Sequence, residues 1–133
     1  MSYIAIFCGG FSSEFDVSIK SGKTILNNIP EPYKGILVVV KKGIWEAQLE
    51  GKTYSFSKED CSITIENKKI NIVAGIVYVH GDPGENGKIQ ALLDLNQVPY
   101  INSGPLASAL SFDKWFCNEF LRGFNIPVAE AIL

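Results

Sequence analysis

The sequence has few of the features that mark an extracellular or membrane protein. Its three cysteines, Cys8, Cys61 and Cys117, are scattered and odd in number, and no CxxC pair is present. This spacing argues against a disulfide framework and against a zinc site, so we expect a reducing cytoplasm. Apolar runs such as "GILVVV" are too short to span a bilayer, and the N-terminus lacks the basic and apolar segments of an export signal.

An excess of charge of one sign is also missing. The 133 residues carry 12 Lys and Arg against 14 Asp and Glu, which gives a formal net charge of −2 with the two signs interspersed. Without a basic stripe, a nucleic-acid partner is not expected. Hydrophobic residues at 47% and charged residues at 20% are close to globular averages, and the length is enough for one domain with its own core.

The N-terminal part of the chain predicts a strand, a helix and a second strand. Residues 3–7, "YIAIF", form a short apolar run before a glycine pair, which predicts a strand buried on both faces. Ser13 is expected to cap a helix that continues to about Asn28, and Pro30 ends it because proline cannot extend the hydrogen-bond ladder. Residues 34–40, "KGILVVV", are the next buried strand. This order is typical of a parallel crossover unit.

The pattern changes over residues 41–73, where apolar and polar residues alternate with a period of two. Turn residues at 50–51 and 67–68 divide this part into two predicted β-hairpins, inserted between parallel strands. Residues 74–79, "AGIVYV", restore the buried-strand pattern. They place the only histidine of the chain, His80, at the carboxyl end of a strand.

The C-terminal part predicts further helices: one around Ile89, one starting at Pro105, and one capped by Asp113. The pattern "NIPVAEAIL" predicts a further strand. We therefore expect an α/β fold, a three-layer domain with a mainly parallel sheet over residues 1–123. Residues 124–133 are expected to begin a second domain.

Two loops are candidates for binding a small molecule. The loop "GGFSSE" contains Glu14, and the loop "HGDPGENG" begins with His80. In parallel sheets, ligands bind at the carboxyl ends of neighbouring strands. If the two strands are neighbours, the carboxylate and the imidazole face one crevice. That crevice could hold a zwitterion, with the carboxylate pairing with an ammonium and the loop N–H groups receiving an anion.

Each of these residues also has a purely structural explanation. Glu14 lies in the first turn of a helix, where the macrodipole alone favours a carboxylate. His80 can be hydrogen-bonded to a neighbouring carbonyl. Ser12 and Ser13 lack a local base and are better explained as caps than as nucleophiles. Lys114, at a helix start, can be a solvated residue or one that is held there for a phosphate.

Three longer motifs carry a resemblance to a known family. The strings "GGFSSEFDVSIKSG", "HGDPGENGKIQALLDLNQVPYINSGPLASALSFDK" and "NIPVAEAIL" together resemble the N-terminal part of the D-alanine–D-alanine ligases of the ATP-grasp superfamily. The resemblance covers most of the chain outside residues 41–73, in the same order and spacing. It implies a Rossmann-like (pre-ATP-grasp) domain, followed by the start of a central ATP-grasp domain.

The resemblance also implies roles for individual residues. Glu14 matches the glutamate that binds the ammonium of the first D-alanine, and Val17 and Ser18 match residues that line the same subsite. His80 matches the histidine of the substrate pocket, and Glu14 and His80 are the implied catalytic residues. Lys114 matches a lysine that reaches the phosphates of ATP.

The activity implied is ATP-dependent formation of the D-alanyl-D-alanine dipeptide through an acyl phosphate, for peptidoglycan synthesis in a bacterial cytoplasm. ATP and Mg²⁺ or Mn²⁺ are the implied cofactors, D-alanine and ATP the small-molecule partners, and a homodimer the implied assembly. The metal ligands and the ATP-grasp lysines lie later in the family's sequences. We therefore expect no metal site in these residues, and no activity from them alone.

Some alternatives stay open. The chain has Asn86 and Ala91 where the family usually has an aspartate and a glycine, but neither is among the residues carried over. Ligases that use D-lactate or D-serine as the second substrate are not separated by this segment. An alternative of a different functional class is a non-catalytic α/β module that serves in binding or dimerisation. The joint presence of Glu14, His80 and Lys114 argues against that module.

Overall fold

Residues 2–130 are described by a computed structural model, and they form seven strands and four helices. The helices are α1 (Phe15–Leu26), α2 (Lys88–Leu95), α3 (Pro105–Phe112) and α4 (Lys114–Arg122). The strands are β1 (Ser2–Gly9), β2 (Tyr33–Val40), β3 (Trp45–Leu49), β4 (Lys52–Ser57), β5 (Ser62–Ile65), β6 (Lys68–Val77) and β7 (Tyr100–Ile101). Within residues 2–130, no helix combines the length and the apolar character that crossing a membrane requires.

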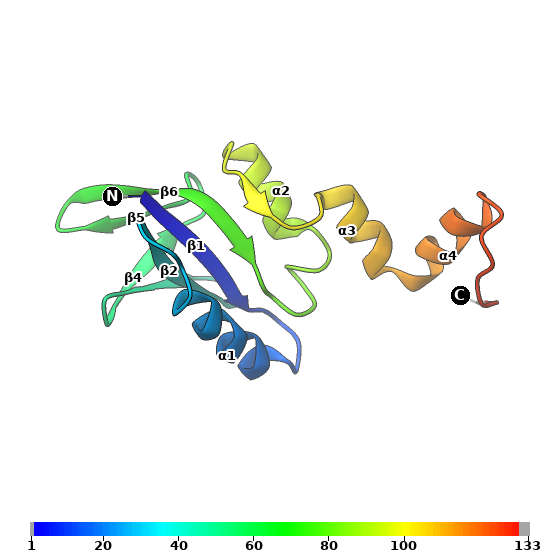
Figure 1. Ribbon diagram of the computed structural model, residues 1–133, viewed down its shortest axis with the longest axis horizontal. Helices are drawn as coiled ribbons and strands as arrows, with labels where there is room; N and C mark the ends of the chain where they lie inside the picture. Colours follow the sequence, from blue (N-terminus) through cyan, green and yellow to red (C-terminus); the bar gives the residue numbers. More distant parts are fainter. Residues whose placement is uncertain (1, 131–133) are drawn as a thin grey trace.

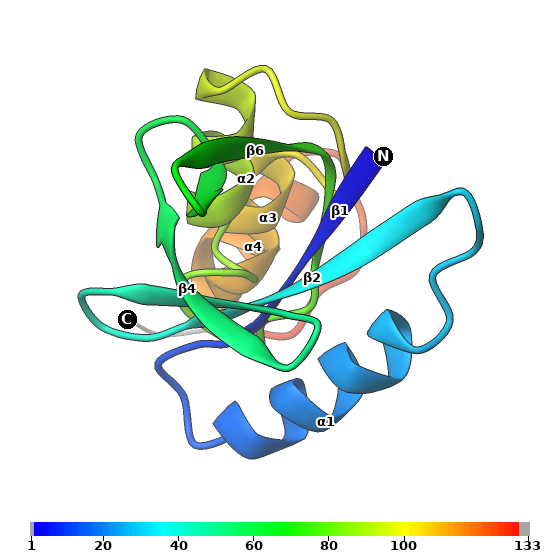
Figure 2. The same ribbon diagram turned by 90° about the vertical axis from the view of Figure 1, so that its left-hand side faces the viewer.

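The sheet is mixed and closes on itself. β1 pairs in parallel with β2 on one side and with β6 on the other, and β6 pairs in parallel with β7. Between β2 and β6, the successive neighbours are antiparallel. The pairing of β1 with β6 therefore closes β1 to β6 into a barrel-like ring, which Figure 2 shows from one end, and β7 lies outside it.

The α/β class is thus confirmed, but the sheet as a whole is not mainly parallel. The predicted hairpins exist, yet their strands are part of the ring and do not stand apart as an insertion. β6 runs without a break through residue 73, the expected end of the insertion. Its first half pairs with β5 and its second half with β1, so one strand serves both the hairpin and the parallel part.

The ends of several elements differ from the prediction. The second hairpin turns at Glu66 and Asn67, both with positive φ, one residue earlier than expected. Asp113 caps α4 as predicted, because its Oδ1 accepts hydrogen bonds from the N–H groups of Trp115 and Phe116, each at 3.1 Å. Residues 126–130 form no strand, and residues 131–133, the rest of the predicted final strand, lie outside the described part.

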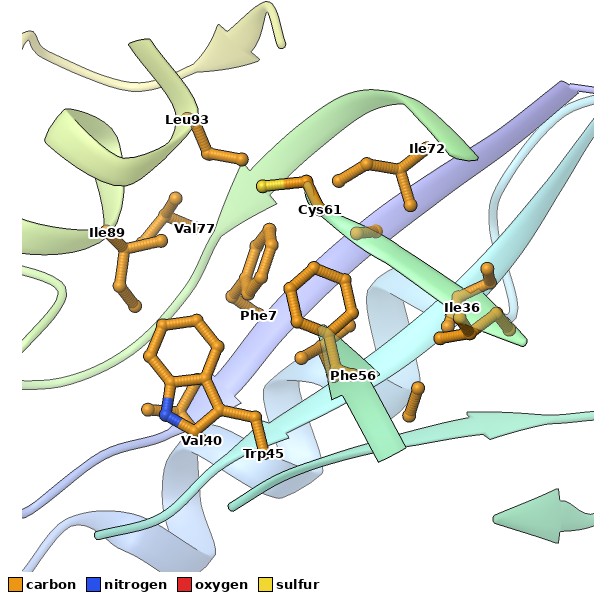
Figure 3. Packing of buried hydrophobic residues seen from close by; sticks show 14 of the residues in the cluster. Phe7, Ile36, Val40, Trp45, Phe56, Cys61, Ile72, Val77, Ile89 and Leu93 are labelled. Atoms are coloured by element: carbon orange, nitrogen blue, oxygen red, sulfur yellow. The ribbon is translucent and has the colours of Figure 1, made fainter. Parts of the chain in front are cut away.

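The main core fills the inside of the ring. Phe7 of β1 lies edge-on to Phe56 of β4 and to Trp45 of β3, with ring centroids 5.5 and 6.0 Å apart. Ile89 and Leu93 of α2 pack on the same cluster (Figure 3). Helix α2 therefore covers one opening of the ring, and its position fixes the loop that precedes it.

A second apolar cluster lies outside the ring, under α1. Ile6, Cys8, Leu37 and Val39 of β1 and β2 face this helix, which lies along the two strands in Figure 1. Gly22 makes the close approach possible, because a Cβ at this position would lie 2.8 Å from Cys8 Cβ and 3.1 Å from Leu37 Cδ1. Helices α3 and α4 lead away from the ring (Figure 1).

The replacement Gly22→Ala is expected to lower the free energy of unfolding by about 1–2 kcal/mol. The new methyl group is too close to Cys8, and the cost of this overpacking is expected to exceed the roughly 1 kcal/mol that alanine gains through its higher helix propensity. Chemical denaturation measures the difference. Thr24→Ala, on the exposed side of the same helix, is the control, and it gains propensity without a clash. A Gly22→Ala variant as stable as the parent would show that the helix can move outward at no cost.

Candidate functional site

The two predicted loops leave the sheet side by side. β1 and β6 pair in parallel up to Phe7 and Val77, so both chains emerge at the same end. At the end of β6, the N–H of Tyr78 donates to the carbonyl oxygen of Phe7 at 2.8 Å. Beyond both strands, the N–H of Phe11 donates to the carbonyl oxygen of Asp82 at 2.9 Å. The expected neighbourhood of the two loops is therefore confirmed.

Glycine makes the close contact of these loops possible. Gly10 has a φ of +106°, and a Cβ at this position would lie 2.6 Å from Val79 Cγ1 and 3.2 Å from the carbonyl oxygen of His80. A larger residue would have to push the second loop away. The glycine pair after β1 thus lets the first loop lie directly on the backbone that leads to His80.

Glu14 stands at the start of α1. It is the N-cap residue, with φ −89° and ψ 15°, and its carbonyl oxygen accepts the first helical hydrogen bond, from the N–H of Ser18 at 3.0 Å. The predicted cap, Ser13, is wrong by one position. The reason is local: the N–H of Glu14 donates to Ser12 Oγ at 3.2 Å, so the turn includes one more residue before the helix begins. The Glu14 side chain is exposed.

Val17 and Ser18 are adjacent in sequence, but their surroundings are opposite. The side chain of Val17 is 53% exposed, whereas Ser18 is completely buried. Ser18 Oγ accepts a hydrogen bond from the N–H of Gly9 at 2.8 Å and donates to the carbonyl oxygen of Tyr78 at 2.5 Å. The hydroxyl therefore holds the ends of β1 and β6 together, and it acts as both donor and acceptor within the protein.

His80 lies half-buried in the second loop, close to the first. Its ring is perpendicular to that of Tyr78, with the centroids 5.5 Å apart. Its carbonyl oxygen accepts a hydrogen bond from Ser12 Oγ at 2.9 Å. Of the five predicted residues, the structure thus brings the backbones of Glu14, Ser18 and His80 into one hydrogen-bonded region.

Lys114 lies in a different place. It is the first residue of α4 and lines a pocket of about 630 Å³ that none of the other four predicted residues lines. The pocket walls come from the end of β6, the loop that carries Glu85, α2, and the serine-rich helix α3. The structure does not place Lys114 in one crevice with Glu14 and His80.

Sequence reasoning missed several polar residues in that pocket, and the most buried of them is Gln90. Gln90 of α2 is only 3% exposed, and its Oε1 is buried without a hydrogen-bond partner among the described residues. It lines the same pocket as Lys114. The signal in the sequence was a polar residue next to Ile89 and three before Leu93, the two buried apolar residues of the helix.

Two of the three cysteines, Cys8 and Cys61, are buried as free thiols. Burial raises the pKa of the Cys8 thiol to about 12 and that of Cys61 to about 11, so both thiols stay protonated at neutral pH. Cys8 Sγ contacts the carbonyl oxygen of Val38 at 3.7 Å, as a weak donor. Neither thiol is a candidate nucleophile.

Asp82 is the perturbed carboxylate of the second loop. The ammonium of Lys88 donates to both of its oxygens, at 3.0 and 2.9 Å, and these hydrogen bonds hold the pKa of Asp82 below its usual range. Because the folded pKa is lowered, the stabilisation is present above the usual carboxyl range and is lost as the pH falls through the lowered value. The pair is exposed, so its effect on global stability is small.

The replacement Lys88→Gln is therefore expected to raise the pKa of Asp82 toward the usual aspartate value. An NMR titration that follows the side-chain carboxyl carbon of Asp82 measures this change. Lys20→Gln, an exposed lysine on α1, is the control and should leave the titration unchanged. An unchanged pKa in Lys88→Gln would mean that other groups, such as Asn86, set it.

Comparison with known proteins agrees with the geometry. The sequence model of the family "D-ala D-ala ligase N-terminus" matches residues 3–103. A D-alanine--D-alanine ligase of Azobacteroides pseudotrichonymphae is 36% identical over 100% of the chain and 42% of its own length.

Two solved structures are similar in fold and sequence. D-alanyl-alanine synthetase A of Vibrio cholerae has a TM-score of 0.81 and 32% identity, over 95% of the chain and 38% of its own. The Bacillus anthracis D-alanine--D-Alanine ligase complexed with ATP has a TM-score of 0.71 and 26% identity. The match covers 98% of the present chain and 39% of the Bacillus chain. The chain spans about two fifths of the length of these proteins. With the family match over most of its length, the chain belongs to the family of D-alanine–D-alanine ligase N-terminal domains.

Proposed function

We propose that the chain is the N-terminal substrate-binding part of an ATP-dependent D-alanine–D-alanine ligase. The observation that carries the proposal is the fastening of the Glu14 loop to the His80 loop at the carboxyl ends of two neighbouring parallel strands. A carboxylate and an imidazole supported there suit a small amino acid. The names of the related proteins point to the same substrate.

In this proposal, Glu14 receives the ammonium of the first D-alanine. Its carboxylate is exposed and forms no ion pair with the residues that the structure describes, so it is available to a cationic group. His80 forms another side of the subsite, with its ring supported by Tyr78. Val17 offers exposed apolar surface near Glu14. Ser18 is fully buried, and its part in the subsite is to support the Glu14 loop through its hydrogen bonds to Gly9 and Tyr78.

Lys114 is proposed to contact the phosphates of ATP. Lys114 lines an open pocket together with Ser108 and Ser111, and a lysine ammonium and serine hydroxyls can donate hydrogen bonds to phosphate oxygens. When bound, ATP would supply the phosphoryl group that activates the carboxylate of the first D-alanine for attack by the amine of the second. No group of three or more His, Cys, Asp or Glu side chains in residues 2–130 could hold a metal ion, so we assign no Mg²⁺ or Mn²⁺ ligand to them.

Further parts of the proposal come from the family alone. They are a role in peptidoglycan synthesis, a homodimer and a cytoplasmic location. The choice between D-alanine, D-lactate and D-serine as second substrate is not assigned to this chain. We also propose that β2, β1, β6 and β7, which are parallel to their neighbours in this order, are the Rossmann-like part of the fold.

The test is phosphate release from ATP with D-alanine, measured on the complete gene product that contains these residues. Glu14→Gln is expected to lower kcat/KM for D-alanine by about 10- to 100-fold, because a charged hydrogen bond to the ammonium contributes roughly 1.5–3 kcal/mol. Asp16→Asn is the matched control. It removes the other carboxylate from the start of α1, and it should leave kcat/KM nearly unchanged.

Equal losses in the two variants would mean that Glu14 acts only as a charge at a helix start. An active parent with an unimpaired Glu14→Gln variant would remove Glu14 from the site. A folded parent that is inactive with D-alanine, D-lactate and D-serine would overturn the ligase proposal in favour of a binding or dimerisation module.

A further inference from the structure

Ser12 joins the two residues proposed to hold the substrate. Its Oγ accepts a hydrogen bond from the N–H of Glu14 at 3.2 Å and donates to the carbonyl oxygen of His80 at 2.9 Å. The two residues are far apart in the sequence, and one hydroxyl bridges their backbones. Neither a main-chain group nor an apolar side chain of this size can accept from one loop and donate to the other at the same atom.

The second loop is shaped to receive Ser12. Gly81, directly after His80, has a φ of +75°, and a Cβ at this position would lie 3.2 Å from Ser12 Cβ. The N–H of Gly81 donates to Glu85 Oε2 at 2.9 Å, which holds the turn from its other side. The absence of a side chain at Gly81 therefore lets Ser12 approach the His80 carbonyl closely.

A different serine holds the strands themselves. Ser18, which is fully buried, links Gly9 to Tyr78 below the loops. The N–H of Phe11 gives a further link, to the carbonyl oxygen of Asp82. These contacts do not involve Ser12, which is only partly buried. Removal of the Ser12 hydroxyl should therefore leave the fold intact. It should only allow Glu14 and His80 to move relative to each other.

We propose that Ser12 is a positioning residue that fixes the separation between Glu14 and His80 and so sets the geometry of the amino-acid subsite. The ammonium and the carboxylate of D-alanine are bonded to the same carbon, so the distance between them is short and fixed. A shift of the two loops by a fraction of an ångström therefore weakens the contacts with these two groups. The identity of the ligand rests on the proposed function. The positioning role depends on the hydrogen bonds of Ser12 and not on the ligand, so it can be measured without one.

The first measurement uses the 133-residue chain. His80 is its only histidine, so the ring C–H resonances of His80 are unambiguous in an NMR spectrum. Ser12→Ala is expected to shift and broaden these resonances, because the His80 loop loses its hydrogen bond from Ser12 Oγ. Ser13→Ala, at the adjacent exposed serine, should leave them unchanged. Gly81→Ala, which keeps the hydroxyl but blocks the approach, should reproduce the effect of Ser12→Ala.

Thermal unfolding separates positioning from a loss of structure. Ser12→Ala should keep the melting temperature within a few degrees of the parent, since the inner links remain. His80 resonances that superimpose on those of the parent in Ser12→Ala would overturn the proposal, whatever the activity. A large fall in melting temperature would overturn it too, because Ser12 would then be a general support of the fold.

The second measurement uses the complete gene product and D-alanine. Ser12→Ala is expected to raise KM for D-alanine by about five- to tenfold with kcat nearly unchanged, as expected for the loss of one hydrogen bond that acts on ground-state binding. Ser12→Thr, which keeps a hydroxyl, should restore part of the loss. An unchanged KM in an active Ser12→Ala enzyme would contradict the positioning role. An inactive parent would instead contradict the proposed function, and the NMR result would still decide on Ser12.

Discussion

The parallel pairing of β1 with β6 is the contact on which both the core and the candidate site depend. It aligns Phe7 with Val77, and it closes the ring that buries the side chain of Phe7 against Phe56. The same pairing makes two loops emerge at one end of the sheet, although some 65 residues of chain separate them. Core packing and the geometry of the site are therefore coupled: a change that loosens the ring also separates Glu14 from His80.

Two serine hydroxyls extend this pairing beyond the last backbone hydrogen bonds of the strands. Ser18 is buried and has both a donor and an acceptor partner, so the cost of removing its hydroxyl from water is offset. Ser12 repeats the arrangement nearer the surface. The strand ends are thus held by side chains at the point where sheet hydrogen bonding stops.

Local patterns in the sequence predicted the parts of the fold that local forces determine. The apolar runs of β1 and β2, the turn at 50–51 and the Asp113 cap were all found, because each depends on residues within a few positions. Closure of the ring was missed. It depends on β6 pairing with β1, which is distant in the sequence, and periodicity says nothing about which strands meet.

The same division applies to the site. Glu14 and His80 stood out because each follows a predicted strand, but the sequence left open whether those two strands are neighbours. The pairing of β1 with β6 answers that question. The hydrogen bonds of Ser18 could not be predicted, since they depend on where the carbonyl of Tyr78 lies. Nor could the location of Lys114, which depends on how α3 leads the chain away from the ring (Figure 1).

Ring closure has a consequence for how the domain behaves in concentrated solution. Open sheets present unpaired N–H and C=O groups along their outer strands, and these groups can recruit strands from other molecules. Here the first and the sixth strands pair with each other, and the outer strand β7 has only two residues. The described part of the chain therefore offers a short template for strand addition. Ring closure therefore limits edge-to-edge association through the topology of the sheet itself.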